Sequence, residues 1–210
     1  MSTNHRLFIK KEEQARFHYD DPQAINQMAS ILHEMTAFFT KRDLIIICIG
    51  TDRSTGDSLG PLIGSKLEAA SLRRFHVYGT LEHPFHAVNM EERLEKIKRD
   101  HWRPFIIAID ACLGQLSSVG YMTLAHGPVQ PGAAVSKKLP PIGDIHMTGI
   151  VNVGGMMEFF VLQNTRLHTV MEMADSMAKA IVKADQMLPN QERIPTFFEA
   201  LKRKGKSALS

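Results

Sequence analysis

The stretch Leu44-Ile-Ile-Ile-Cys-Ile-Gly-Thr-Asp-Arg-Ser-Thr-Gly-Asp-Ser-Leu-Gly-Pro61 predicts a buried strand, a glycine-bounded loop and the start of a helix. The continuous apolar run 44–49 is typical of a strand that is covered on both faces in a parallel sheet. Gly50 ends this run. Pro61 suits the first turn of a helix, where its missing N–H has no partner to lose. One strand–loop–helix unit of an α/β domain is therefore expected here.

The same alternation of strands and helices continues along the chain. The apolar segments 76–81, 105–109 and 120–125 predict further strands. Apolar residues at helical spacing predict helices near 25–39, 60–71, 90–100, 153–163, 166–188 and 195–203. Strands that alternate with helices predict an α/β fold, a three-layer αβα sandwich with a mainly parallel central sheet.

Composition indicates one globular domain. The chain has 210 residues, of which 44% are hydrophobic and 22% charged, a balance that excludes a disordered protein. We expect an irregular lead-in over 1–22, a single αβα domain over 23–203 and a basic tail over 204–210. The two cysteines, Cys48 and Cys112, fall in segments expected to be internal, which favours a reducing cytosol over a disulfide framework.

Charge and hydropathy exclude two classes of partner. The formal net charge is only +3, and basic residues gather in the tail, which is unlike a nucleic-acid-binding face. No apolar run reaches the length of roughly 18 residues that a membrane span needs. We therefore expect no nucleic acid and no membrane as partners.

Two aspartates are the first candidates for chemistry. Asp110 follows the strand expected at 105–109, and Asp57 lies in the loop after the strand 44–49. Ligands of open α/β sheets bind beyond the carboxyl ends of the strands. Two carboxylates held close together share a proton and can serve as base and acid. The structural alternatives are that Asp57 caps the following helix and that Asp110 bonds to its own turn.

His146 is the third candidate. Together with Asp57 and Asp110 it offers three ligands for a divalent metal ion such as zinc or nickel, with a position left open. Cys112 and His146 are also weighed as a nucleophile and its base, although a small buried cysteine is the commoner case. The loop 50–58 lacks the lysine of a phosphate-binding loop, so a nucleotide site is disfavoured.

Three motifs in this order resemble the YyaC group of sporulation proteins, often called spore proteases. The motifs are Ile49 to Pro61, Ile109-Asp-Ala-Cys-Leu-Gly114 and Gly143-Asp-Ile-His-Met-Thr-Gly-Ile-Val-Asn-Val-Gly-Gly155. The chain also resembles, more remotely, the germination protease of endospores and the hydrogenase maturation proteases. Those families imply an αβα sandwich with acidic residues after two central strands.

The resemblance implies roles for single residues. In both remote families acidic residues stand where Asp57 and Asp110 stand, and the maturation proteases have a histidine that aligns with His146 and helps to contact nickel of the substrate hydrogenase. The germination protease lacks a counterpart of His146, and both families have Asn where this chain has Thr51. The resemblance therefore supports the place of the site more than its mechanism.

Further residues are expected to contact a substrate. Gly50, Thr51 and Gly149 would allow close backbone approach, and Arg53 would steer an anionic group beside the spare carboxylate of Asp52. Pro131, Gly132 and Thr148 complete the expected set, since Pro131-Gly132 resembles a Pro-Gly step of the germination protease and Thr148 precedes Gly149.

The resemblance implies a peptidase-like hydrolase of sporulation, acting on a protein or peptide in the forespore or mother-cell cytosol. A non-catalytic protein that binds a peptide or metal in the same pocket is the first alternative. Hydrolysis of a non-peptide amide or ester by the same residues is the second.

Overall fold

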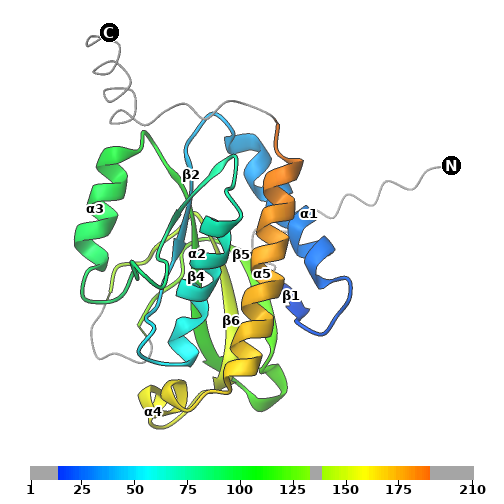
Figure 1. Cartoon of the computed structure of the whole chain (residues 1–210), viewed down its shortest axis with the longest axis vertical. Helices are drawn as coiled ribbons and strands as arrows, with labels where there is room; N and C mark the ends of the chain where they lie inside the picture. Colours follow the sequence, from blue (N-terminus) through cyan, green and yellow to red (C-terminus); the bar gives the residue numbers. More distant parts are fainter. Residues whose placement is uncertain (1–13, 133–138, 190–210) are drawn as a thin grey trace, which may run out of the picture.

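The computed structural model describes residues 14–132 and 139–189, which form a six-stranded mixed sheet with helices on both faces (Figure 1). The strand order is β1-β5-β6-β4-β2-β3. β6, β4, β2 and β3 run parallel, β5 pairs antiparallel with β6, and β1 pairs antiparallel with β5. The strands are β1 (Ala15–His18), β2 (Leu44–Cys48), β3 (Phe75–Tyr78), β4 (Phe105–Gly114), β5 (Tyr121–His126) and β6 (Ile145–Val153).

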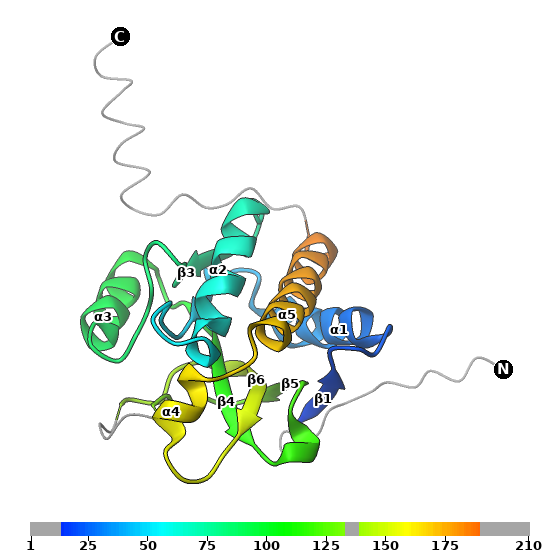
Figure 2. The ribbon, with the colours of Figure 1, turned by 60° about the horizontal axis from the view of Figure 1, so that its bottom comes forward.

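The helices form the two outer layers. α1, α2 and α5 lie on one face of the sheet, and α3 lies on the other (Figures 1 and 2). The predicted α/β sandwich with a mainly parallel sheet is thus confirmed. The helices are α1 (Ala24–Thr36), α2 (Leu59–Ala69), α3 (Met90–Asp100), α4 (Glu158–Gln163) and α5 (Leu167–Met187), with 3-10 turns η1 (Ala37–Phe39), η2 (Gly56–Ser58) and η3 (Leu116–Ser118).

The apolar run that predicts β2 explains its central place. Ile46 and Cys48 belong to the core under α1, α2 and α5, whereas Ile45 and Ile47 belong to the core under α3. All five residues of the strand are buried. Because β2 is covered on both faces, its carboxyl end is held rigidly, and the loop that follows has a fixed origin.

Three elements differ from expectation. The lead-in contains β1, which pairs antiparallel with β5 and so is not wholly irregular. β4 extends through Asp110 to Gly114, so that Asp110 lies within the strand and does not end it. β6 occupies a segment for which the sequence analysis predicts no strand, and the helix expected over 153–163 is shortened to α4. Apolar and polar residues alternate at the start of β6, which is the pattern of a strand, but Gly149 interrupts the alternation.

Several expectations fall outside the described residues, namely the helix 195–203, the tail 204–210 and most of the lead-in. Within the described part of the chain, no helix is both long and apolar enough to cross a membrane.

Candidate functional site

A pocket of about 560 Å³ lies at the carboxyl ends of β2 and β4. The loop after β2, the last part of β4 and α4 all contribute to its lining, and α4 lies below the ends of β4 and β6 in Figure 1. The pocket is where ligands of open α/β sheets bind. Its lining residues come from 49–54 and 57, 84, 86–88 and 90, 110–113, 129–132 and 139, and 158–159 and 162–163.

The loop after β2 folds back tightly and brings Asp57 to this pocket. The Thr51 N–H donates a hydrogen bond to the Asp57 carbonyl oxygen over 3.1 Å. Gly50 has a φ of +143°, and a Cβ at this position would overlap the same carbonyl oxygen. Only glycine fits both demands without strain. Asp57 then lies in η2, and the N-terminus of α2 carries no side-chain cap, so the capping alternative for Asp57 is not supported.

Asp110 reaches the pocket from β4. The Ala111 N–H donates a hydrogen bond of 2.9 Å to Oδ1 of Asp110. The structural alternative, in which the Asp110 side chain bonds to the neighbouring backbone, is thus partly correct. Burial raises the pKa of Asp110 well above its usual range, and the negative charge of Asp57 raises it further, against the opposing hydrogen bond from Ala111. Burial also raises the pKa of Asp57. A carboxylate pair in this state favours one shared proton.

His146 is not brought to the two aspartates. It lies near the start of β6, opposite Ala108, whereas Asp110 pairs with Thr148 further along the same two strands. Nδ1 of His146 donates a hydrogen bond of 2.9 Å to the carbonyl oxygen of Gly127, and the residue does not line the pocket. His146 lies apart from the aspartates because it belongs to β6, a strand that the sequence analysis does not predict. This strand places His146 toward the opposite end of the sheet.

The three-ligand metal set is therefore not assembled. Among the described residues, no third His, Cys, Asp or Glu joins Asp57 and Asp110 in a cluster fit to hold an ion. Two carboxylates fall short of the three protein ligands typical of catalytic zinc. We derive no chemical step through a metal at this pair, and a metal there stays a prediction.

The substrate residues predicted in the glycine loop and in Pro131-Gly132 all line the pocket. Asp52 and Arg53 are exposed at its edge, and the Thr51 hydroxyl lies 3.4 Å from Oδ1 of Asp52. Arg53 is thus placed to meet an anionic group that enters from solvent.

Thr148 and Gly149 have other surroundings. The Thr148 hydroxyl is buried and hydrogen-bonded to that of Thr123 over 2.6 Å. A Cβ at Gly149 would overlap Leu59 and come within 2.8 Å of Met173, so this glycine allows close packing against the helices. Neither residue lines the pocket, and the expected approach of a substrate to Gly149 is replaced by that packing.

Sequence reasoning missed several lining residues, among them the polar Ser54, His86 and Glu158 and the aromatic Phe159. A sequence signal existed for His86, because it follows the strand expected beside 44–49 and the carboxyl ends of parallel strands share one edge. The Gly50 N–H donates to the carbonyl oxygen of Phe85, which holds His86 next to the glycine loop. Ser54 Oγ is the one buried side-chain nitrogen or oxygen without a partner in the described residues.

The two cysteines are both free, as expected. Cys48 is fully buried in β2, where burial raises its pKa. Cys112 lines the pocket, but burial and the nearby Asp110 raise its pKa to about 11, although a hydrogen bond with Thr148 lowers it. Nucleophilic cysteines have a lowered pKa, so the Cys112–His146 alternative is disfavoured.

Comparison with solved structures shows the fold. The structure is similar to the [NiFe] hydrogenase maturation protease HycI from Thermococcus kodakarensis KOD1, with 17% identity, a TM-score of 0.50 and coverage of 74% of this chain and 99% of that one. A second similar structure, the hydrogenase 3 maturation protease, has 15% identity, a TM-score of 0.42 and coverage of 67% and 89%.

Comparison of sequences shows the kinship. The chain is 49% identical over 189 residues to the protein YyaC of Bacillus subtilis (strain 168), which covers 90% of this chain and 92% of that protein. The profile of the family described as "Protein of unknown function (DUF1256)" matches residues 16–180, which span β1 to most of α5. The resemblance to the YyaC group is thereby confirmed, and the chain belongs to the DUF1256 family.

Proposed function

We propose that this protein is a peptidase-like hydrolase that cleaves an amide bond of a protein or peptide with Asp57 and Asp110. One observation carries the proposal: Asp57 and Asp110 line the same pocket, where burial raises the pKa of both carboxyls and the charge of Asp57 raises that of Asp110 further. Perturbed titratable groups that meet in a cleft are a mark of functional sites.

The two aspartates divide the chemistry according to their surroundings. Asp110 keeps the shared proton, since its pKa is raised both by burial and by the charge of Asp57. Asp57 is then the ionised partner and takes a proton from a water molecule as the water oxygen bonds to the amide carbon. The C–N bond breaks as Asp110 gives its proton to the leaving nitrogen. Transfer of the proton from Asp57 to Asp110 restores the pair.

The pocket suits a substrate with an apolar side chain. Its volume of about 560 Å³ is in the range of ligand sites. Of the residues that line it, Val88 is 90% exposed and Phe159 is 50% exposed, and Phe160, which follows Phe159 in the chain, is also exposed. Exposed apolar side chains that gather at a pocket mark a site of interaction with another molecule.

The proposal includes two further predictions, one on the biological process and one on a metal ion. A role in sporulation, in the forespore or mother-cell cytosol, is proposed from kinship with YyaC of Bacillus subtilis. A zinc or nickel ion at Asp57 and Asp110 stays a prediction, which elemental analysis of protein purified without chelator would check.

The test is cleavage of a complex mixture of synthetic peptides, with new termini identified by mass spectrometry. The wild type is expected to create termini at recurrent apolar residues, and Asp57→Asn and Asp110→Asn are expected to create none while remaining folded. Asp175→Asn is the matched control, because Asp175 of α5 forms an ion pair with Lys66 of α2 at the surface. Peptides that bind without new termini would overturn the hydrolase and favour the binding protein, and cleavage that survives in both aspartate variants would overturn the role of the pair.

A further inference from the structure

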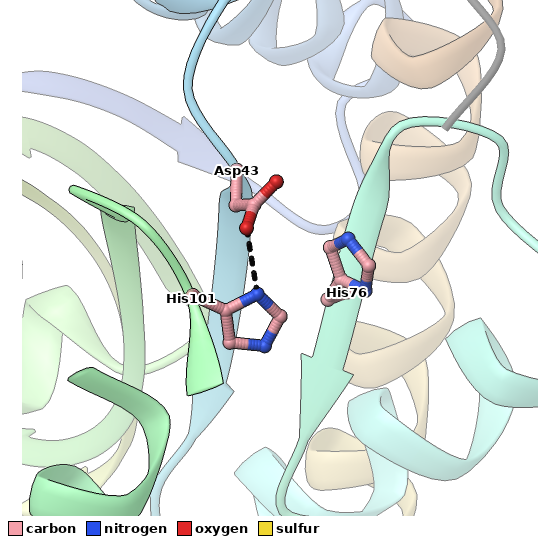
Figure 3. A group of neighbouring side chains, drawn as sticks. All are labelled: Asp43, His76 and His101. Carbon is pink, nitrogen blue, oxygen red and sulfur yellow. Dashed lines mark hydrogen bonds and ion pairs between the residues drawn. The ribbon is translucent and has the colours of Figure 1, made fainter. Parts of the chain in front are cut away.

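A second cluster of polar side chains lies at the opposite edge of the sheet, where β2 and β3 begin. Asp43 directly precedes β2, His76 is the second residue of β3, and His101 follows the last residue of α3. Figure 3 shows the carboxylate and the two imidazole rings facing a common space. Because the pocket lies at the carboxyl ends of β2 and β4, this cluster is separate from Asp57 and Asp110.

The cluster has the dimensions of a metal site. One ligand atom from each of Asp43, His76 and His101 lies within 4.8 Å of the other two. Oδ2 of Asp43 and Nδ1 of His101 are 2.9 Å apart, close to the separation of neighbouring ligands around a bound ion. The rings of His76 and His101 are tilted by 58°, with centroids 4.8 Å apart, so they are not stacked face to face.

Tyr78 supplies the outer contact that a metal-binding histidine needs. Its hydroxyl lies 2.7 Å from Nε2 of His101, on the side of the ring away from Asp43. His101 is almost completely buried, with a side-chain exposure of 1%, so its ring cannot turn freely. Histidine ligands commonly donate their second ring N–H to such a partner, which fixes the ring and its tautomer.

We propose that Asp43, His76 and His101 bind one divalent transition-metal ion, with zinc as the first choice and solvent in the remaining position. Two imidazoles and one carboxylate form a ligand set that zinc accepts. Without metal, His101 donates Nδ1–H to Asp43 and accepts from the Tyr78 hydroxyl. On binding, Nδ1 becomes a ligand, the proton resides on Nε2, and Nε2–H donates to the Tyr78 oxygen.

The charges around the cluster are compatible with a bound cation. The nearby guanidinium of Arg74 interacts with the Asp43 carboxylate, but Asp185 is its stronger partner and its N–H donates to the Thr40 carbonyl oxygen. Oδ1 of Asp185 in turn accepts the Arg74 backbone N–H over 2.8 Å. Arg74 is therefore held mainly by other groups, and the Asp43 carboxylate remains available as a ligand.

The test uses full-length, tag-free protein that carries Asp57→Asn and Asp110→Asn, so that the other predicted metal position is removed. Calorimetry after chelator treatment is expected to give one zinc per chain, and cobalt is expected to give the visible absorption of a tetrahedral site. His76→Gln and Asp43→Asn are each expected to weaken zinc binding by about a hundredfold or more, and Tyr78→Phe by about tenfold. His168→Gln, a change at an exposed histidine of α5, is the matched control and is expected to leave binding unchanged.

A tautomer measurement keeps the proposal testable even if a ligand variant fails to fold. Nitrogen NMR of the parent protein is expected to show His101 protonated on Nδ1 without zinc and on Nε2 with zinc. The proposal is overturned if zinc does not bind in a one-to-one ratio, if binding survives both His76→Gln and Asp43→Asn, or if the His101 tautomer stays the same. In that case the Asp43–His101–Tyr78 hydrogen bonds only stabilise the edge of the sheet.

Discussion

The carboxylate of Asp57 lies close enough to that of Asp110 for its negative charge to raise the Asp110 pKa beyond the effect of burial. The two residues come from different strand ends, so only the folded chain creates this repulsion. Such an arrangement opposes folding at neutral pH, and it persists where function depends on it. The relationship therefore has consequences for stability as well as for catalysis.

We expect Asp110→Asn to stabilise the protein near neutral pH. Folding raises the pKa of Asp110 well above that of an ordinary aspartate, chiefly through burial, so the folded state binds more protons than the unfolded state. Stability consequently falls as the pH rises from the unfolded pKa through the folded one. Removing the charge should raise the free energy of unfolding by about 1 kcal/mol near neutral pH and by much less near the unfolded pKa.

Urea unfolding of wild type and variant at both pH values measures this difference. Asp175→Asn serves as control, because an exposed carboxylate in a surface pair should change stability little at either pH. A less stable Asp110→Asn protein near neutral pH would mean that the hydrogen bond from Ala111 outweighs the repulsion.

A second prediction separates steric overlap from backbone strain in the glycine loop. Gly50 and Gly155 have nearly the same φ, +143° and +145°, but a Cβ at Gly50 would overlap Asp57 whereas a Cβ at Gly155 meets nothing within 4 Å. Gly155→Ala should cost about 1 kcal/mol, the strain alone. Gly50→Ala should cost about 3 kcal/mol or more, since the loop must also open.

Thermal unfolding of the two alanine variants gives the comparison directly. Equal losses of stability would show that the loop relaxes freely around the new methyl group, and that the hydrogen bond from Thr51 to Asp57 does not hold it.

Continuous apolar runs made the central sheet predictable. The run 44–49 and the run 105–109 could only be covered on both faces, and this places Asp57 and Asp110 at one edge without any knowledge of contacts. The pocket residues of the glycine loop followed from the same rule, whereas Pro131-Gly132 followed only from the resemblance to the germination protease. The residues that lie together at the carboxyl ends of β2 and β4 could thus be predicted from the sequence.

The position of His146 could not be predicted, because it depends on β6, a strand that the sequence pattern does not reveal. His146 and Thr148 alternate with apolar residues, but Gly149 interrupts this alternation after only a few residues, so the sequence does not predict the strand. Gly149 proves to be a packing residue against α2 and α5, a role that depends on distant segments. The cluster of Asp43, His76 and His101 could not be predicted from the sequence either, because its members lie at three different elements.

A third prediction concerns the thiol in the pocket. Burial raises the pKa of the Cys112 thiol to about 11. The thiolate fraction near pH 8 should then be about a hundredfold lower than for an unperturbed thiol, and alkylation by iodoacetamide correspondingly slow. Mass spectrometry of labelling over time measures the rate, and labelling in urea gives the rate of the unprotected thiols. Rapid modification of Cys112 in the folded protein would contradict the raised pKa and reopen a nucleophilic role.

The last prediction is the dependence of peptide cleavage on pH. The proposed mechanism needs Asp57 ionised and Asp110 protonated, so kcat/KM should rise as the pair loses its first proton and fall as it loses the second. Because the pKa values of both residues are raised, the whole profile should lie above the range of ordinary aspartates. The two limbs belong to the pair and not to either residue alone.

Each aspartate variant is expected to change the pH profile of kcat/KM in its own way. Asp110→Asn should lower kcat/KM by about 10² to 10⁴-fold and abolish the descending limb, since the acid is gone. Asp57→Asn should lower the rate similarly, and any residual activity should fall off at a lower pH, because the charge that raised the Asp110 pKa has been removed. Asp175→Asn should reproduce the wild-type curve. A descending limb that stays in place in both aspartate variants would assign the acid to another group, and His86 at the edge of the same pocket would be the first to replace.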